Sequence, residues 1–184
     1  MSHDIVDAGL VAGTWNIDPV HSEVGFTVRH LMSKVRGRFQ TFSGTVTTGE
    51  TLLESAVQAT IEVSSINTNN AQRDGHLQSA DFFDPESGQQ LTFVSSGIRE
   101  GDDGYVIDGD LTINGTTKSV ELAAEFLGVA ADPRGETRLG AEATVSISRK
   151  DYKVDFNIPL DGGKLLIGDK VDITLNIEAV LAQA

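Results

Sequence analysis

The sequence predicts an all-β protein: an antiparallel, up-and-down β-barrel of eight strands. Three observations support this fold class. About eight segments alternate apolar and polar residues with a period of two, as strands with one dry and one wet face do. Short glycine-containing turns separate most of these segments, which fits the 19 glycines of the chain. Clean alternation favours antiparallel pairing, and closing eight such strands into a barrel removes their exposed edges.

The length of 184 residues is typical of one all-β domain. We expect residues 1–12 to form a flexible N-terminal tail and residues 13–182 to form a single barrel domain. Acidic residues stand in the N-terminal segment where a signal peptide needs positive charge, so the sequence predicts a cytoplasmic protein. No apolar run approaches the ~18 residues that a membrane-spanning segment needs, so we expect no such segment.

Charge and motif content restrict the possible functions. With 14 basic and 27 acidic residues the net charge is −13, which argues against a nucleic-acid partner held by a general basic surface. Cysteine is absent, so disulfide and thiolate chemistry are excluded. His21, His30 and His76 lack metal-ligand spacing, and no zinc-protease, serine-hydrolase, dinucleotide or phosphate-loop motif is present. We therefore expect neither a metal nor a cofactor.

Residues 24–46 predict a ribbon of two strands. One strand alternates as far as His30, which ends its inward row, and the next strand returns after a short break rich in basic residues. Between Phe39 and Phe42 the alternation slips by one residue. A β-bulge absorbs such a slip, so the sequence predicts a bulge at this place.

The next strand covers residues 57–63, and the β pattern then stops. Residues 69–84 predict a short helical insertion, which Asn70 caps and the Asp84-Pro85 pair ends. Alternation resumes in four further segments, at residues 91–95, 105–113, 139–147 and 171–179.

The Asn114-Gly115 pair is the strongest local signal, because it supplies the two positive-φ residues of a type I′ hairpin turn. Counting outward from the turn predicts the register of the hairpin. It pairs Leu111 with Lys118, Gly109 with Val120, Ile107 with Leu122 and Tyr105 with Ala124. The apolar rows of both strands then share one face, which supports this register. The same register places Asp108 opposite Glu121, which is mildly unfavourable.

The two ends of the predicted barrel differ in charge. The connections at one end are short and acidic, whereas those at the other end are longer and carry most of the bases: His30, Lys34, Arg36, Arg38, Arg73, His76, Lys118, Arg149, Lys150 and Lys153. His30, Lys118 and Arg149 continue inward-facing rows, so we expect them at the rim of the barrel. There they would bind an anionic group or pair with a nearby acid such as Asp81 or Asp155.

An eight-stranded barrel is just wide enough to be filled by side chains or to hold one small ligand. Small inward residues such as Ala59 and Ala143 leave space, although bulky partners across the barrel could fill it. The predicted ligand-binding residues are Phe26, Val28, His30, Phe39, Phe42, Ala59, Ile61, Arg73, His76, Leu77, Phe82, Phe83, Leu111, Ile113, Lys118, Leu122, Ala143, Val145, Arg149 and Ile173.

Several motifs together resemble the YceI-like family of bacterial polyisoprenoid-binding proteins. They are Trp15-x-x-Asp18-Pro19-x-His21-Ser22, Phe26-x-Val28-x-His30-Leu31, Gly37-x-Phe39-x-x-Phe42-x-Gly44, Arg73-Asp74-x-His76-Leu77-x-Ser79-x-Asp81-Phe82-Phe83, Gly109-x-Leu111-Thr112-x-Asn114-Gly115-x-Thr117-Lys118, Arg149, and Gly168-Asp169-x-Val171. The resemblance covers roughly residues 14–181. It implies a lipocalin-like barrel whose interior holds a long isoprenoid chain or another amphiphile, often in a dimer. The segment that follows Arg149 departs from the wording expected for the family.

Three functions remain open from the sequence. The first is non-enzymatic binding, transport or storage of a long-chain isoprenoid or similar amphiphilic lipid, such as a polyprenyl phosphate or an isoprenoid quinone, with a homodimer as a possible assembly. The second is an enzyme that acts on such a lipid, with Arg73, Asp74 and His76 as acid or base groups. The third is an interaction module with a solid core and no ligand.

Overall fold

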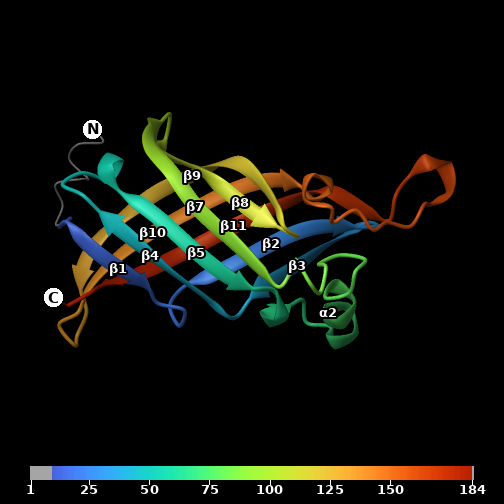
Figure 1. The fold of residues 1–184 in the computed structure, drawn as a ribbon, viewed down its shortest axis with the longest axis horizontal. Helices are drawn as coiled ribbons and strands as arrows, with labels where there is room; N and C mark the ends of the chain where they lie inside the picture. The colour runs from blue at the N-terminus through green and yellow to red at the C-terminus, as the bar shows by residue number, and fades with distance from the viewer. Residues whose placement is uncertain (1–9, 184) are drawn as a thin grey trace.

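The computed structural model describes residues 10–183, and its strands form one antiparallel sheet that closes on itself (Figure 1). The strands are β1 (Gly13–Ile17), β2 (Glu23–His30), β3 (Ser33–Phe39), β4 (Phe42–Thr48), β5 (Ala56–Glu62), β6 (Ile66–Asn67), β7 (Gln90–Gly101), β8 (Gly104–Ile113), β9 (Thr116–Ala131), β10 (Thr137–Ser148) and β11 (Ile167–Leu181). The helix is α2 (Ala71–Leu77), and the 3₁₀ turns are η1 (Leu52–Glu54), η2 (Val63–Ser65), η3 (Arg149–Tyr152) and η4 (Asp161–Gly163). No helix within these residues has the length and apolarity of a membrane-spanning segment.

Eight strands close the barrel in the order β1, β4, β5, β7, β8, β9, β10 and β11, and β11 pairs with β1. Short non-strand segments separate the shorter strands β2, β3 and β6 from β1, β4 and β5, which neighbour them in the sequence. These three strands extend the sheet from β11. The predicted eight-stranded antiparallel barrel with one short helical insertion is therefore confirmed. Residues 1–9 of the predicted tail lie outside the described residues, while Leu10 packs against the cluster of Trp15, Leu139 and Ala179.

The predicted slip between Phe39 and Phe42 is a strand break, with Gln40 and Thr41 between β3 and β4. Both phenyl rings are buried in the barrel. The backbone amide of Gln40 donates to the carbonyl of Ser65 at 3.1 Å, so the break is held by a neighbouring connection. The one residue in excess of regular alternation is thus accommodated by a break between two strands, and not by the predicted bulge within one strand.

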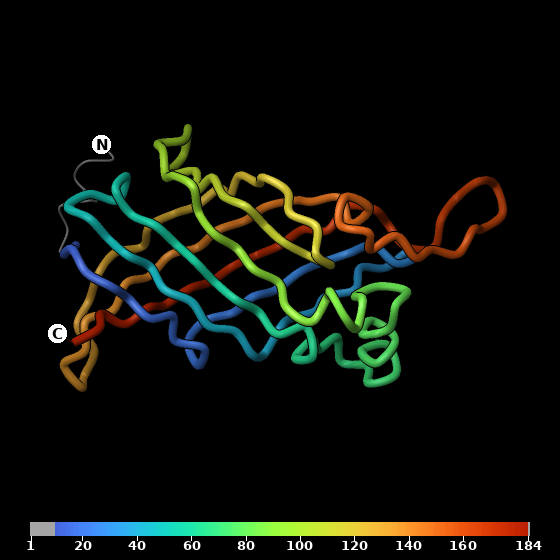
Figure 2. The backbone as a smooth tube through the Cα atoms, viewed as in Figure 1, coloured from blue at the N-terminus to red at the C-terminus, as the bar shows by residue number. Residues whose placement is uncertain are grey.

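The connections gather at two ends of the elongated barrel, as Figure 2 shows. The helix end carries the β2–β3 turn, α2, the β8–β9 turn and residues 150–166. The termini end carries the first and last described residues together with the β4–β5 and β9–β10 connections. The β4–β5 and β9–β10 connections at the termini end are among those that the sequence predicts to be acidic. The connections predicted to be basic lie at the helix end.

The β8–β9 hairpin has the predicted register, and both turn residues have positive φ, 53° for Asn114 and 71° for Gly115. The unfavourable pair of Asp108 and Glu121 is present but screened. Arg99 donates to Asp108 Oδ2 at 2.9 Å and contacts Glu121 Oε1 at 3.1 Å. One exposed guanidinium therefore compensates both carboxylates.

The core has two parts. The larger cluster follows the inner face of the barrel, and a smaller one packs Trp15, Leu139 and Ala179 at the termini end. Trp15 is fully buried, and its indole Nε1 donates to Thr48 Oγ1 at 2.8 Å. This tryptophan satisfies its one polar atom and closes the termini end with a packed core.

Candidate ligand-binding cavity

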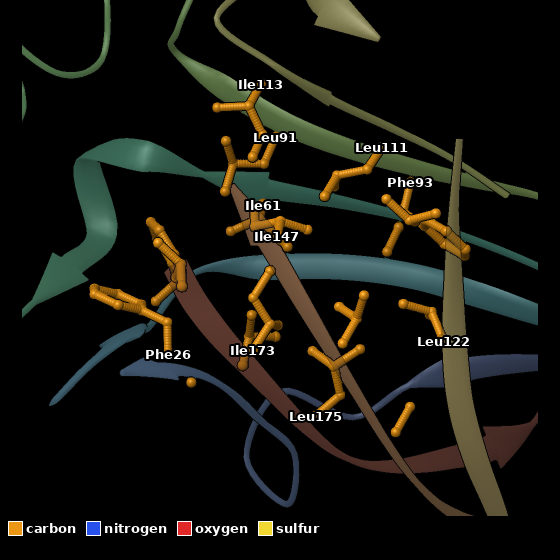
Figure 3. Close-up of a pocket in the computed structure, with 18 of the residues that line it drawn as sticks. Phe26, Ile61, Leu91, Phe93, Leu111, Ile113, Leu122, Ile147, Ile173 and Leu175 are labelled. Atoms are coloured by element: carbon orange, nitrogen blue, oxygen red, sulfur yellow. The ribbon is translucent and has the colours of Figure 1, made fainter. Parts of the chain in front are cut away.

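A cavity of about 270 Å³ lies inside the barrel (Figure 3). Inward side chains of strands from the whole ring line it, and nearly all of them are apolar. The labelled side chains in Figure 3, among them Phe93, Ile147 and Leu175, come from different strands and point toward a common space. The volume is near the lower limit of typical small-molecule sites, about 300–1,000 Å³. The interior therefore suits a slender apolar molecule.

Most of the predicted ligand-binding residues line this cavity. They are Phe26, Val28, Phe39, Phe42, Ala59, Ile61, Leu77, Phe82, Phe83, Leu111, Ile113, Leu122, Ala143, Val145, Arg149 and Ile173. Parity assigns the faces of β10 and β11 as predicted: Ala143 and Leu175 line the cavity, whereas Thr144 and Thr174 are exposed. Alternation along the strands placed these side chains, because successive Cβ atoms point to opposite faces of a sheet.

Four predicted bases, His30, Lys118, Arg73 and His76, do not line the cavity. Lys118 does pair with Leu111, as predicted, but the side chain of Lys118 is exposed, whereas Leu111 lines the cavity. His30 ends β2 opposite Ile167, and of these two residues only Ile167 lines the cavity. None of these four bases is part of the cavity wall, and their predicted role around its opening stays a prediction.

The Arg73-x-x-His76 segment serves the helical insertion. Arg73 Nε donates to Thr68 Oγ1 at 2.8 Å, and its Nη2 donates to the Thr68 carbonyl at 2.7 Å. Asp74 Oδ1 accepts from the Thr68 amide at 3.0 Å. His76 Nε2 contacts Asp81 Oδ2 at 2.8 Å. The contacts with Thr68 fasten α2 to the residues before it, and the contact with Asp81 fastens it to the residues after it.

Arg149 is the one predicted base in the cavity wall, at the start of η3. Its side chain is buried, and its guanidinium donates to four backbone carbonyls. Nε donates to Gly168 at 2.8 Å, Nη1 to Val154 at 2.7 Å and Phe156 at 2.9 Å, and Nη2 to Ile167 at 3.4 Å. A guanidinium has five N–H groups, so one remains unused by these contacts. Arg149 therefore holds the loop that covers the helix end.

No carboxylate within residues 10–183 forms an ion pair with Arg149. Burial lowers the pKa of its guanidinium, although the more distant charges of Asp169 and Asp155 oppose this shift. Only the dipoles of backbone carbonyls compensate this buried cation, so an additional hydrogen-bond acceptor or anion would stabilise it.

Tyr152 ends η3 and also lines the cavity. Its side chain is 1% exposed, and its hydroxyl has no hydrogen-bond partner among the described residues. Burial raises the pKa of this phenol to about 12, so it stays protonated and available as a donor. Residues three apart in a 3₁₀ turn project from the same side, which places the hydroxyl on the same side of η3 as Arg149.

Sequence reasoning missed Tyr152, Val154, Leu91 and Phe93 as cavity residues. Leu91 and Phe93 alternate within β7, so parity alone was a sufficient signal for them. Tyr152 and Val154 lie in a connection without periodicity, and nothing in the sequence marks their side chains as inward. Among the described residues, no group of three or more acidic or histidine side chains could hold a metal ion.

Asn114 links this loop to the helical insertion. Its buried side-chain amide donates to the Phe82 carbonyl at 2.7 Å and to the Tyr152 carbonyl at 3.2 Å, and its Oδ1 accepts from the Asp84 amide at 2.8 Å. The turn residue predicted from its backbone conformation thus also fastens both segments that cover the helix end of the cavity.

Comparisons with known proteins agree with this architecture. The YceI-like domain family matches residues 15–179. Protein YceI of Escherichia coli is 40% identical over 174 residues, which cover 92% of this chain and 88% of that protein. UPF0312 protein plu2095 of Photorhabdus laumondii is 39% identical over 177 residues, covering 94% of this chain and 89% of that protein.

Solved structures share the barrel. The Campylobacter jejuni YCEI protein has a TM-score of 0.71 at 28% identity and covers 84% of this chain and 90% of its own. BcnA of Burkholderia cenocepacia has a TM-score of 0.73 at 23% identity, covering 88% and 98%. A polyisoprenoid binding domain from Saccharophagus degradans has a TM-score of 0.66 at 16% identity, covering 94% and 100%.

Proposed function

The chain belongs to the YceI-like family, and we propose that it binds, carries or stores a long-chain isoprenoid or similar amphiphilic lipid without chemical conversion. The observation that supports this proposal best is the cavity of about 270 Å³ with its almost wholly apolar wall. Each Å² of apolar lipid surface that enters it contributes roughly 25 cal/mol. The polyisoprenoid binding domain of Saccharophagus degradans, which shares the fold, agrees with this ligand class.

The polar groups of the wall suggest how the lipid is oriented. Arg149 and Tyr152 lie together in η3 at the helix end, whereas Trp15 and its neighbours fill the termini end. The chain of the lipid would then extend toward the termini end. Its head would lie at η3, where the tyrosine hydroxyl and the unused guanidinium N–H both donate hydrogen bonds. A phosphate, a quinone carbonyl or an alcohol oxygen can accept them.

Catalysis by Arg73, Asp74 and His76 has less support, because these side chains contact Thr68 and Asp81 and none of them lines the cavity. We therefore propose no enzymatic step for them. A cytoplasmic location and a homodimer also stay predictions. Cell fractionation tests the first, and sedimentation velocity tests the second.

The experiment is extraction of lipid from protein purified without detergent, followed by mass spectrometry. We expect a stoichiometric amphiphile with a long apolar chain. Its absence, together with failure of added polyprenyl phosphate or quinone to bind, would contradict the proposal. Incubating the recovered lipid with the protein tests the enzymatic alternative, since chemical conversion would favour it and unchanged lipid would favour a carrier.

A further inference from the structure

Two large apolar side chains occupy the tip of the β2–β3 hairpin at the helix end. Leu31 is 51% exposed and Met32 is 95% exposed. Two-residue hairpin turns usually take glycine, asparagine or aspartate, because the backbone there needs positive φ. Leu31 nevertheless has φ 57°, a conformation that leucine adopts at an energetic cost. The turn therefore presents apolar surface where neither packing nor backbone preference favours it.

A second connection extends this surface. The Leu31 amide donates to the Leu166 carbonyl at 2.7 Å, and the Leu166 amide donates to the Ile158 carbonyl at 3.0 Å. Ile158 and Leu165 each expose about half of their side chains. Figure 2 shows this connection projecting beyond the barrel at the helix end, next to the β2–β3 turn. We call Leu31, Met32, Ile158 and Leu165 the apolar tip.

Cations lie directly behind the apolar tip on the outer face of the same hairpin. They are Arg29, Lys34, Arg36 and Arg38, all exposed, and none forms an ion pair within residues 10–183. Arg29 pairs across the strands with Lys34, and directly opposed like charges destabilise a sheet. The chain carries a net charge of −13, so this basic face is a local exception.

We propose that the helix end docks on the surface of an anionic lipid bilayer, with the apolar tip inserted between headgroups. The combination of exposed apolar side chains and adjacent lysine and arginine is what interfacial membrane binding requires. Charge complementarity fixes the orientation. The basic hairpin faces the anionic surface, whereas the acidic turns of the termini end, such as that with Glu50 and Glu54, point away. Asp169 and Asp172 lie on β11, which pairs with β2, and the charge of Asp172 interacts with that of Lys34, so these acids weaken the attraction.

Docking in this orientation brings the cavity to the membrane. Val28 and Ile167 line the cavity, and Ile167 pairs with His30 next to the tip. A lipid could therefore pass between bilayer and barrel near η3. The inference goes beyond the proposed function, because attachment to a vesicle does not need a ligand in the cavity.

Co-sedimentation with vesicles tests the proposal. One vesicle set contains phosphatidylcholine alone, and the other contains equal parts of phosphatidylcholine and phosphatidylglycerol. We expect the protein to bind the second set at least about tenfold more strongly, with binding lost as salt rises from about 0.1 to about 1 M. Equal binding to both sets, or binding to neither, would overturn the proposal.

Matched variants identify the surface. Met32→Asp should reduce binding to anionic vesicles about tenfold, whereas Val20→Asp, at an 82% exposed residue between β1 and β2, should not. Lys34→Glu should reduce binding, whereas Arg134→Glu, with the same change of charge in the β9–β10 turn, should not. Equal effects within either pair would contradict docking by this surface.

A second copy of the chain is the competing occupant of the apolar tip. If Met32→Asp leaves vesicle binding unchanged but converts a dimer to a monomer in sedimentation velocity, the tip is a contact between copies and the membrane proposal is wrong. Loss of vesicle binding with an unchanged oligomeric state supports docking. Circular dichroism of each variant confirms that it is folded.

Discussion

Arg138 and Arg149 lie at opposite ends of the barrel and are held in opposite ways. Arg138, near the termini end, contacts carboxylates: Asp132 and Asp18 at 2.8 Å, Glu178 at 3.0 Å and Glu136 at 3.5 Å. Arg149, at the helix end, donates hydrogen bonds only to backbone carbonyls within residues 10–183 and borders the cavity. Carboxylates of the same chain therefore neutralise the charge of Arg138, whereas no carboxylate within residues 10–183 pairs with Arg149.

The pKa values follow this difference. The hydrogen bonds with Asp132 and Asp18 raise the pKa of the Arg138 guanidinium, and Arg138 lowers the pKa of Asp18 to about 2. Burial lowers the pKa of Arg149. Next to Arg138, Trp15 fills the termini end, whereas an unpaired Tyr152 hydroxyl accompanies Arg149. The termini end is built for stability, and the polar groups of the helix end have capacity left for a ligand.

Filling the cavity should produce the largest effect on binding. Ala143 is buried and lines the cavity midway along β10, so Ala143→Trp should occupy the space of the lipid and abolish its uptake, while the barrel still folds. Titration with a fluorescent lipid measures the uptake. Thr144→Trp, on the outer face of the same strand, is the control and should bind normally. Native lipid content in Ala143→Trp would place the ligand elsewhere.

Removing the positive charge of Arg138 at the termini end should lower the stability of the fold and leave lipid binding unchanged. Arg138→Met leaves Asp18 and Asp132 without their arginine partner, and we expect the free energy of unfolding to fall. Urea unfolding measures it. Arg134→Met, at an exposed residue of the β9–β10 turn just before β10, should change stability by no more than about 0.5 kcal/mol. Lipid affinity of folded Arg138→Met should be unchanged, and a loss of affinity would mean that the two ends are coupled.

The acid stability of the protein should depend on the same end. The pKa of Asp18 is about 2 in the fold against an ordinary value of 3.8, so its ionised form is stabilised by folding. This contribution is fully present above about pH 4 and is lost as the pH falls toward 2. Thermal unfolding across this window should show the loss, and Arg138→Met should reduce it. An equal slope in both proteins would contradict the role of Asp18.

The smallest expected effect comes from removing the Tyr152 hydroxyl at the helix end. Tyr152→Phe removes a buried hydroxyl that has no described partner, so the ligand-free protein should gain up to about 1 kcal/mol of stability. If the hydroxyl binds the lipid head, affinity for a polyprenyl phosphate or quinone should fall about tenfold, with no change for a hydrocarbon of equal length. Tyr105→Phe, at a buried tyrosine that does not line the cavity, is the control. An unchanged affinity in Tyr152→Phe would exclude the hydroxyl from the head site.

The amino-acid sequence by itself determined the strands, their faces and one register. Side chains alternate across a strand, so the apolar rows identified Ala143, Val145 and Ile173 as inward residues without any tertiary information. The Asn114-Gly115 turn set the β8–β9 register, because its backbone conformation restricts the residues that can form it.

Only the tertiary structure decided where the cavity ends and which polar groups reach it. Lys118 and His30 continue inward rows, and their cross-strand partners Leu111 and Ile167 line the cavity, but neither base is part of the wall. Alternation alone carries no information about this difference. Tyr152 enters the wall from a connection without periodicity. Its position depends on contacts that Arg149 and Asn114 make with segments far away in the chain. Local patterns fix the face of a residue, whereas its place along the barrel follows from such long-range contacts.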